Sequence, residues 1–128
     1  MIVAVLRVQG RTLSVDLCLN WIPEDRLQRV WRVGEMRLGG RISEASGFTL
    51  HLSEGDDGRQ VVEDSLAALQ PIASRLAELV DGGATAEIDL GLMVQADAPL
   101  SVEISPSYLQ VLERCKIGIR VSAYPSSD

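Results

Sequence analysis

The sequence predicts a two-layer α+β fold, in which a mixed or antiparallel sheet of about five strands carries two main helices on one face. Several short segments alternate apolar and polar residues, as strands covered on one face do. The segment 60–81 is amphipathic with helical periodicity, so it needs an apolar surface to lie on. A chain of 128 residues is long enough for one domain and too short for two ordinary ones.

The predicted elements follow the order β-α-β-β-α-β-α-β. Residues 2–8 are β-branched and almost continuously apolar, which predicts a central strand buried on both faces. Ser14 is a suitable N-cap for a short helix that ends before Pro23. Residues 27–34 predict a second strand. The segment from Gly34 to Gly47 holds four glycines, which favours a long connection or an irregular hairpin.

The middle of the chain predicts a strand followed by the long helix. From 48 to 53, alternate residues are expected to face inward (Phe48, Leu50 and Leu52) and outward (Thr49, His51 and Ser53). Asp57 is the expected cap of the helix over 60–81, with Gln60 placed to complete a capping box. The apolar periodicity continues through Pro71. We therefore expect a kinked helix or two collinear pieces, without a change of direction.

Two strands and a helix complete the predicted domain. Residues 85–95 alternate again, and Ser105-Pro106 is a strong helix start. That helix is expected to bury Leu109, Leu112 and Cys115, and the strand 117–124 to bury Ile117, Ile119, Val121 and Ala123. Asp89 and Arg120 would pair across the wetter sheet face if their strands are neighbours. Residues 125–128 are expected to be the tail of a single domain that spans 1–128.

Composition narrows the functional classes. The net charge is −6, with 18 acidic and 12 basic residues, which disfavours nucleic acid and anionic membranes as partners. No apolar run approaches the length that crosses a bilayer, and the first residues do not resemble a signal peptide. We therefore expect a cytoplasmic protein. In that compartment Cys18 and Cys115 should be reduced, buried and inert.

The sequence offers no motif for catalysis, metal binding or a cofactor. Residues 34–41 have phosphate-loop glycine spacing but lack its Lys-Ser/Thr pair. The acidic turn at 53–58 places Ser53 and Gly55 where a calcium loop needs carboxylates, so helix capping explains it better. His51 is the only histidine and is expected on the surface. We predict no catalytic residue, no metal ligand and no cofactor, and the sequence favours a non-enzymatic role.

The strongest functional signal is a cluster of arginines around a tryptophan. Five of the twelve basic residues fall within 26–41. Arginine and tryptophan are enriched in binding hot spots, and the guanidinium fork suits carboxylates. The competing interpretation is that Glu24, Asp25, Glu35 and Glu44 neutralise the cluster as weak surface pairs. The candidate binding residues are Trp31, Arg32, Glu35, Arg37 and Arg41.

The order and spacing of short segments over nearly the whole chain carry a family resemblance. The segments are the first strand, residues 29–35 (RVWRVGE), residues 46–50 (SGFTL), the long helix, and residues 117–125 (IGIRVSAYP). Together they resemble the small bacterial domain-of-unknown-function family 4279. The resemblance implies an intracellular α+β protein of bacterial origin with no established activity or cofactor. It supplies no catalytic residue, although Gly34-Glu35 and Tyr124 match positions familiar in the family.

These observations favour a non-enzymatic protein-interaction module whose partner is another protein or a second copy of itself. An immunity-type protein that masks a toxin is one concrete version. The alternative is a small ligand-binding domain or enzyme with a pocket around Glu35, Arg37 and Arg41. A third interpretation is a homo-oligomer built on the wetter sheet face.

Overall fold

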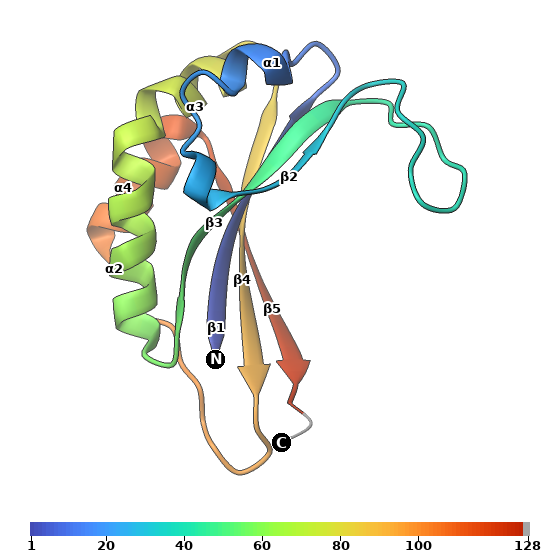
Figure 1. Cartoon of the computed structure of the whole chain (residues 1–128). Helices are drawn as coiled ribbons and strands as arrows, with labels where there is room; N and C mark the ends of the chain where they lie inside the picture. Colours follow the sequence, from blue (N-terminus) through green and yellow to red (C-terminus); the bar gives the residue numbers. More distant parts are fainter. Residues whose placement is uncertain (127–128) are drawn as a thin grey trace.

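Five strands form one mixed sheet in the order β2-β3-β1-β4-β5 (Figure 1). The computed structural model describes residues 1–126. Strand β1 (Ile2–Gly10) lies at the centre and pairs antiparallel with β3 (Ser46–Gly55) and with β4 (Thr85–Val94). On the outside, β2 (Leu27–Trp31) is antiparallel to β3, and β5 (Gly118–Pro125) is parallel to β4. The predicted mixed sheet is confirmed.

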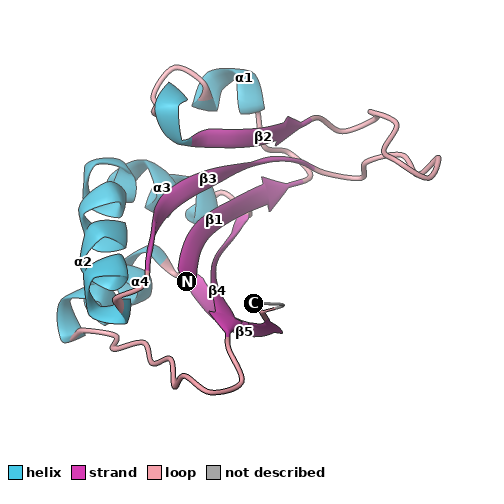
Figure 2. Ribbon diagram, turned by 60° about the horizontal axis from the view of Figure 1, so that its bottom comes forward, coloured by secondary structure: helices cyan, strands magenta, loops and turns pink. Residues whose placement is uncertain are grey.

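Helices cover one face of this sheet, which confirms the predicted two-layer α+β architecture (Figure 2). The main helices are α2 (Gly58–Leu69), α3 (Ala73–Asp81) and α4 (Pro106–Cys115). The short helix α1 (Val15–Cys18), capped by Ser14, and the 3-10 turn η1 (Glu24–Arg26) connect β1 to β2. No helix within residues 1–126 is long and apolar enough to cross a membrane.

Strand β1 is covered on the helix side and left partly open on the other. Ile2, Ala4, Leu6 and Val8 are fully buried, whereas the alternate residues Val3, Val5 and Arg7 are only half-buried. The predicted central position is confirmed, but burial on both faces is wrong. In the described part of the chain no helix packs on the second face, so it forms an open side of the sheet.

The long amphipathic segment forms a helix that is interrupted at Pro71, as predicted. A 3-10 turn, η2 (Gln70–Ile72), separates α2 from α3, and Figure 1 shows α3 bending over toward the start of β4. The expectation of collinear pieces is therefore wrong. Asp57 caps α2 by accepting hydrogen bonds from the backbone N–H of Arg59 and Gln60. The acidic turn is a capping structure, although the Gln60 side chain donates to Asp64 and leaves the capping box incomplete.

A bulge in β3 changes which residues face the helices. Ala4 pairs with Ser53 and Val5 pairs with His51, so Leu52 is the additional residue. The bulge turns Ser53 toward α2, where its hydroxyl donates to the Val61 carbonyl at 2.7 Å. The prediction that Ser53 faces outward is wrong, because simple alternation does not anticipate an inserted residue.

Helix α4 buries a different set of side chains from the one predicted. Leu112 and Cys115 face the core as expected, but Leu109 is 51% exposed. Tyr108 takes its place in the stripe with Val111, and its hydroxyl lies 2.8 Å from that of Ser65 on α2. Because both groups are fully buried, each supplies the hydrogen-bond partner that the other needs.

Both cysteines are buried and unbridged, in agreement with the expected environment. Burial raises the pKa of the Cys18 thiol, which lowers the population of its nucleophilic thiolate. The Cys115 thiol donates to the Ala73 carbonyl at 3.3 Å, which ties α4 to the start of α3.

Strand β5 is an exposed edge, contrary to the prediction of a buried inner face. Ile117 is buried just before the strand, but Ile119 is 36% and Val121 56% exposed, and Ala123 is exposed as well. These side chains point to the helix side, beyond the area that the helices cover. Arg120 lies opposite Asp89, yet its ion pair is with Glu87 at 3.4 Å. Pro125 belongs to β5, and of the predicted tail 127–128 lie outside the described residues.

Candidate binding site at the arginine cluster

The site is built on Trp31, the last residue of β2. Its side chain lies opposite Gly47 of β3 and is only 7% exposed. A β-carbon at position 47 would overlap the indole ring, so this glycine allows the ring to lie flat on the strand. The Arg7 guanidinium lies 4.7 Å from the ring centroid on the open face of the sheet, in cation–π geometry.

An irregular hairpin carries the next part of the site, as the glycine content predicted. Residues 32–45 leave the sheet after Trp31 and return to it at Ser46, forming an arm that projects from the end of the molecule (Figure 1). Met36 bridges to Ile42, and the backbone N–H of Arg37 donates to the Arg41 carbonyl at 2.6 Å. The turn passes through Gly39 and Gly40, whose φ angles of 89° and 82° favour glycine.

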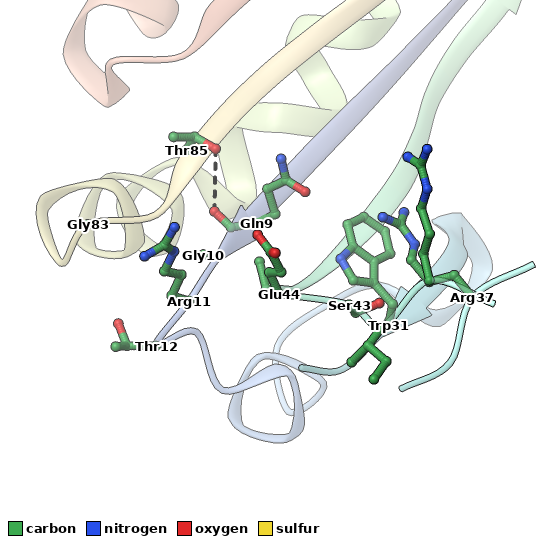
Figure 3. Close-up of a pocket in the computed structure, with 13 residues that line it drawn as sticks. Gln9, Gly10, Arg11, Thr12, Trp31, Arg37, Ser43, Glu44, Gly83 and Thr85 are labelled. Carbon is green, nitrogen blue, oxygen red and sulfur yellow. Dashed lines mark hydrogen bonds between the residues drawn. The ribbon is translucent and has the colours of Figure 1, made fainter. Parts of the chain in front are cut away.

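Two adjoining hollows lie between this arm and the sheet, and we call them together the arginine hollow. Their volumes are about 660 Å³ and about 530 Å³. Both are lined by Trp31, Arg37, Arg41 and Ser43. The larger one extends across the ends of β1 and β4, past Arg11 and Thr85 (Figure 3). The smaller one extends along β2 and is also lined by Arg29 and Glu35.

Among residues 1–126, the arginines at and beside this hollow have no carboxylate partner. Within residues 1–126, no carboxylate oxygen lies within 4.0 Å of the guanidinium nitrogens of Arg7, Arg29, Arg37 or Arg41. The pKa of Arg7 is lowered, first by burial and then by repulsion from Arg37 and Arg29, against which Glu87 acts weakly. Glu44 lines the larger hollow and offsets part of the charge. The result is a locally positive surface on an acidic chain.

Ser43 adds an unmet hydrogen-bonding group to the hollow. The residue is 3% exposed, and its hydroxyl has no partner among the described residues. Buried hydroxyls are normally satisfied, so an unpaired one at a binding surface is a position for a ligand oxygen or for water. Its backbone is fixed by hydrogen bonds of 2.8 Å to Gly34 and Glu35.

The structure brings together four of the five predicted binding residues. Trp31, Glu35, Arg37 and Arg41 all line the smaller hollow. Arg32 lines neither hollow, because it pairs with Asp16 of α1 at 2.9 Å and with Glu35 at 3.7 Å. The hydrogen bond between Arg32 and Asp16 raises the pKa of the guanidinium and lowers that of the carboxyl.

Arg26, the first arginine of the sequence cluster, makes hydrogen bonds to the backbone of β3. Arg26 donates to the carbonyls of Leu52 at 2.8 Å and His51 at 3.4 Å, so it stabilises the bulged end of β3. Neutralisation by acidic neighbours thus holds for Arg32, whereas Arg29, Arg37 and Arg41 have no such ion pair within the described residues.

Arg7 and Ser43 were missed in the sequence. Arg7 is the one charged residue in an otherwise apolar strand, at a position that alternates with the buried residues. That pattern was a usable signal for a side chain on the open face. Ser43 carries no signal of its own, since its burial depends on how the arm folds back toward β2.

His51 lies apart from the hollow. His51 is partly exposed on β3, with Nε2 2.9 Å from a Glu54 carboxylate oxygen, and it lines neither hollow. Within residues 1–126, no group of three or more His, Cys, Asp or Glu side chains is placed to hold a metal ion.

The fold and the hollow define a small α+β protein with an arginine-lined hollow at one end of its sheet. Comparison with protein-family models, with curated proteins and with solved structures found no match. The resemblance to domain-of-unknown-function family 4279 therefore stays a prediction.

Proposed function

We propose that this chain is a non-enzymatic protein-interaction module, and that its arginine hollow binds a carboxylate-rich segment of a partner protein. The observation that carries the proposal is the group of arginines around Trp31 that lack carboxylate partners within residues 1–126. Bringing like charges together has a free-energy cost that intramolecular ion pairs do not offset here. An anionic partner would offset it.

The chemistry of the hollow fits carboxylates. Arg37 and Arg41 present planar donor forks, which bind carboxylates bidentately. The Ser43 hydroxyl supplies a further donor between them and the sheet. The buried Trp31 ring gives the site a rigid apolar floor, as in interface hot spots.

The surrounding features support a binding role in a reducing compartment. His51 stands apart from the hollow, so the most versatile acid–base side chain is not at the proposed site. The buried thiols of Cys18 and Cys115 fit a bacterial, cytoplasmic protein. An immunity-type protein is one form of this proposal, in which the carboxylate-rich segment would belong to a toxin.

Calorimetric titration with a synthetic peptide of consecutive glutamates tests the proposal. We expect saturable binding at low ionic strength that weakens as salt is added, because exposed charges are screened. The double variant Arg37→Glu/Arg41→Glu should reduce affinity at least about tenfold, since each lost charge-assisted hydrogen bond is worth roughly 1.5–3 kcal/mol.

The matched control is Arg75→Glu/Arg114→Glu, which changes the net charge equally at exposed positions of α3 and α4. It should bind the peptide within about twofold of the wild-type chain, because only the hollow matters. Equal loss in both double variants would reduce the effect to net charge and contradict the proposal. So would a wild-type chain that does not bind the peptide at low salt.

A small anionic ligand is the second candidate, favoured by the shared hollow of Glu35, Arg37 and Arg41 and by the unpaired Ser43 hydroxyl. This is the predicted ligand-binding domain or enzyme. Citrate distinguishes the two proposed functions, because it presents carboxylates without a peptide chain. If citrate binds as tightly as the peptide and Ser43→Ala weakens it severalfold, the small-ligand function is the better one. Weak citrate binding beside strong peptide binding supports the protein partner.

A further inference from the structure

We infer that a second copy of this chain pairs with β5, so that the two five-stranded sheets continue into each other across a twofold axis. Strand β5 forms the opposite edge of the sheet from β2, which lines part of the arginine hollow. Pairing at this edge is therefore independent of the proposed function.

Strand β5 is an unprotected sheet edge. It spans Gly118–Pro125, and among residues 1–126 it pairs on one side only, with β4. Its other side presents backbone N–H and C=O groups to solvent. Val121 is 56% exposed and Ile119 36% exposed, beyond the reach of the helices. Figure 1 shows the strand running along the margin of the sheet with no helix beside it.

The other edge shows what a protected edge looks like in the same molecule. Strand β2 covers only Leu27–Trp31, has a register shift between Leu27 and Arg29, and continues into the projecting arm. Short length, irregularity and charge are the devices that prevent sheets from joining edge to edge. Before Pro125, strand β5 has neither short length nor irregularity: it is longer and regular in register, and like β2 it carries a single charge.

The one charged residue of β5, Arg120, is compatible with antiparallel pairing between two copies of this strand. Arg120 pairs with Glu87 of β4 at 3.4 Å, so the edge does not present an uncompensated cation. A twofold axis through Ser122 sets Arg120 opposite Tyr124 of the copy. The two arginines then lie four residues apart, roughly 13 Å along the strand direction. Axes at Arg120 or Val121 bring the arginines opposite or diagonal to each other, which is less favourable.

The same register also suits the helix side of the strand. An axis through Ser122 places Val121 opposite Ala123 of the copy, so the exposed apolar side chains meet across the junction. Such an interface is isologous, because each strand offers and receives the same groups, and it closes as a dimer without further growth. An unrelated strand would need its own matching pattern, whereas a copy already has it.

The interface is small, so association should depend on concentration. Sedimentation equilibrium of the full chain, from low micromolar to submillimolar, should show the mass rising from one chain toward two. Val121→Lys adds a cation at the junction and should raise the dissociation constant about tenfold or more. Leu109→Lys is the matched control: Leu109 is 51% exposed on α4, and its replacement should leave association unchanged.

Cross-linking tests the register directly. Ser122→Cys should form an intermolecular disulfide under mild oxidation, because residues at the axis face each other with β-carbons about 4.5–5.5 Å apart. Ser107→Cys, on the exposed side of α4, should cross-link far more slowly. Cys18 and Cys115 are buried and should not compete.

A wild-type chain that stays monomeric over this range overturns the inference, as does a Val121→Lys variant that associates like the wild type. Equal cross-linking at positions 107 and 122 overturns the register. Arg37→Glu/Arg41→Glu should dimerise like the wild type, so failure of the carboxylate proposal and failure of this one give different results.

Discussion

The close contact between Gly47 and Trp31 fixes the indole ring that lines the arginine hollow. Gly47→Ala should destabilise the protein by about 1–3 kcal/mol, because a methyl group there overlaps the indole ring and the Val8 carbonyl. Gly91→Ala is the matched control on strand β4 of the same sheet, where an added β-carbon meets only ordinary contacts of 3.6–3.9 Å. Chemical denaturation measures both. A loss at Gly47 no larger than at Gly91 would contradict the packing described for Trp31.

The buried hydrogen bond between Ser65 and Tyr108 should be valuable to both partners. Ser65→Ala should cost about 1–3 kcal/mol, since it leaves a fully buried phenol hydroxyl unpaired. Tyr108→Phe leaves the buried Ser65 hydroxyl without a hydrogen-bond partner in the same way. The double variant should lose less than the sum of the two, because the second change removes the group that the first left unsatisfied. Chemical denaturation of the wild type, the two single variants and the double variant completes this double-mutant cycle. If the losses of unfolding free energy in the single variants simply add up in the double variant, the hydrogen bond does not contribute.

Tyr108 should also make stability depend on pH in the alkaline range. Burial raises the pKa of its phenol, and the hydrogen bond to Ser65 opposes that shift only in part. In the unfolded chain the phenol ionises near pH 10, whereas the folded protein still holds the proton. The unfolded state is therefore favoured as pH rises above about 10, and the free energy of unfolding falls.

The measurement compares denaturation of wild type and Tyr108→Phe between about pH 8 and pH 11, around the ordinary phenol pKa. The wild type should lose more stability over this range. Tyr124→Phe, which removes a phenol that is 48% exposed, should follow the wild type. If the free energy of unfolding falls equally with pH in the wild type and in Tyr108→Phe, the Tyr108 phenol does not contribute to the pH dependence of stability.

At the scale of elements, α2 depends on its N-terminal cap. Asp57→Ala should destabilise the protein by about 1 kcal/mol, because the N–H groups of Arg59 and Gln60 lose their acceptor. Asp56→Ala is the control: its carboxylate is almost fully exposed and makes only an ion pair of 3.5 Å to the N-terminus. Thermal unfolding should separate the two variants, and equal effects would contradict a capping role.

The strands differ in how well their own sequences predict which of their side chains are buried. Alternation in β3 and β4 predicts which residues face the helices up to the bulge, because side-chain direction follows the period of the strand. Burial is not set by the period alone: Thr49, on the other face of β3, is also buried. The same alternation in β5 predicts burial that the structure does not have. The apolar residues Ile119 and Val121 lie on the correct side, but the helices end before they reach this strand. Whether a helix covers a strand depends on the length and position of that helix, and the sequence of the strand does not contain this information.

For the whole molecule, local chemistry made the layers and most element boundaries predictable. Capping residues such as Asp57 and Ser105 act within one turn and are visible in the sequence. The site was predictable only in part: Arg37 and Arg41 stand in one cluster, but Arg7 joins them through strand pairing distant in the chain. Arg32, which the sequence also predicts as a binding residue, lies outside the hollow because its partner, Asp16, comes from a helix sixteen residues earlier.

The arginine hollow should lower the stability of the unliganded protein. Arg37 repels Arg7 and helps to lower its pKa, so Arg37→Gln should relieve part of this repulsion. We expect the variant to be more stable by up to about 0.5 kcal/mol at low ionic strength, in the range of exposed charge interactions. The gain should shrink in high salt, because the groups are screened.

Arg75→Gln, at an exposed position of α3, makes the same change of net charge away from the hollow. It reports the general effect of removing one cation from a chain of net charge −6, which should be slightly destabilising. Thermal unfolding at low and high salt should therefore separate the two variants in opposite directions. If Arg37→Gln behaves like Arg75→Gln, repulsion among the arginines is too weak to favour an anionic partner, and the carboxylate proposal loses its electrostatic basis.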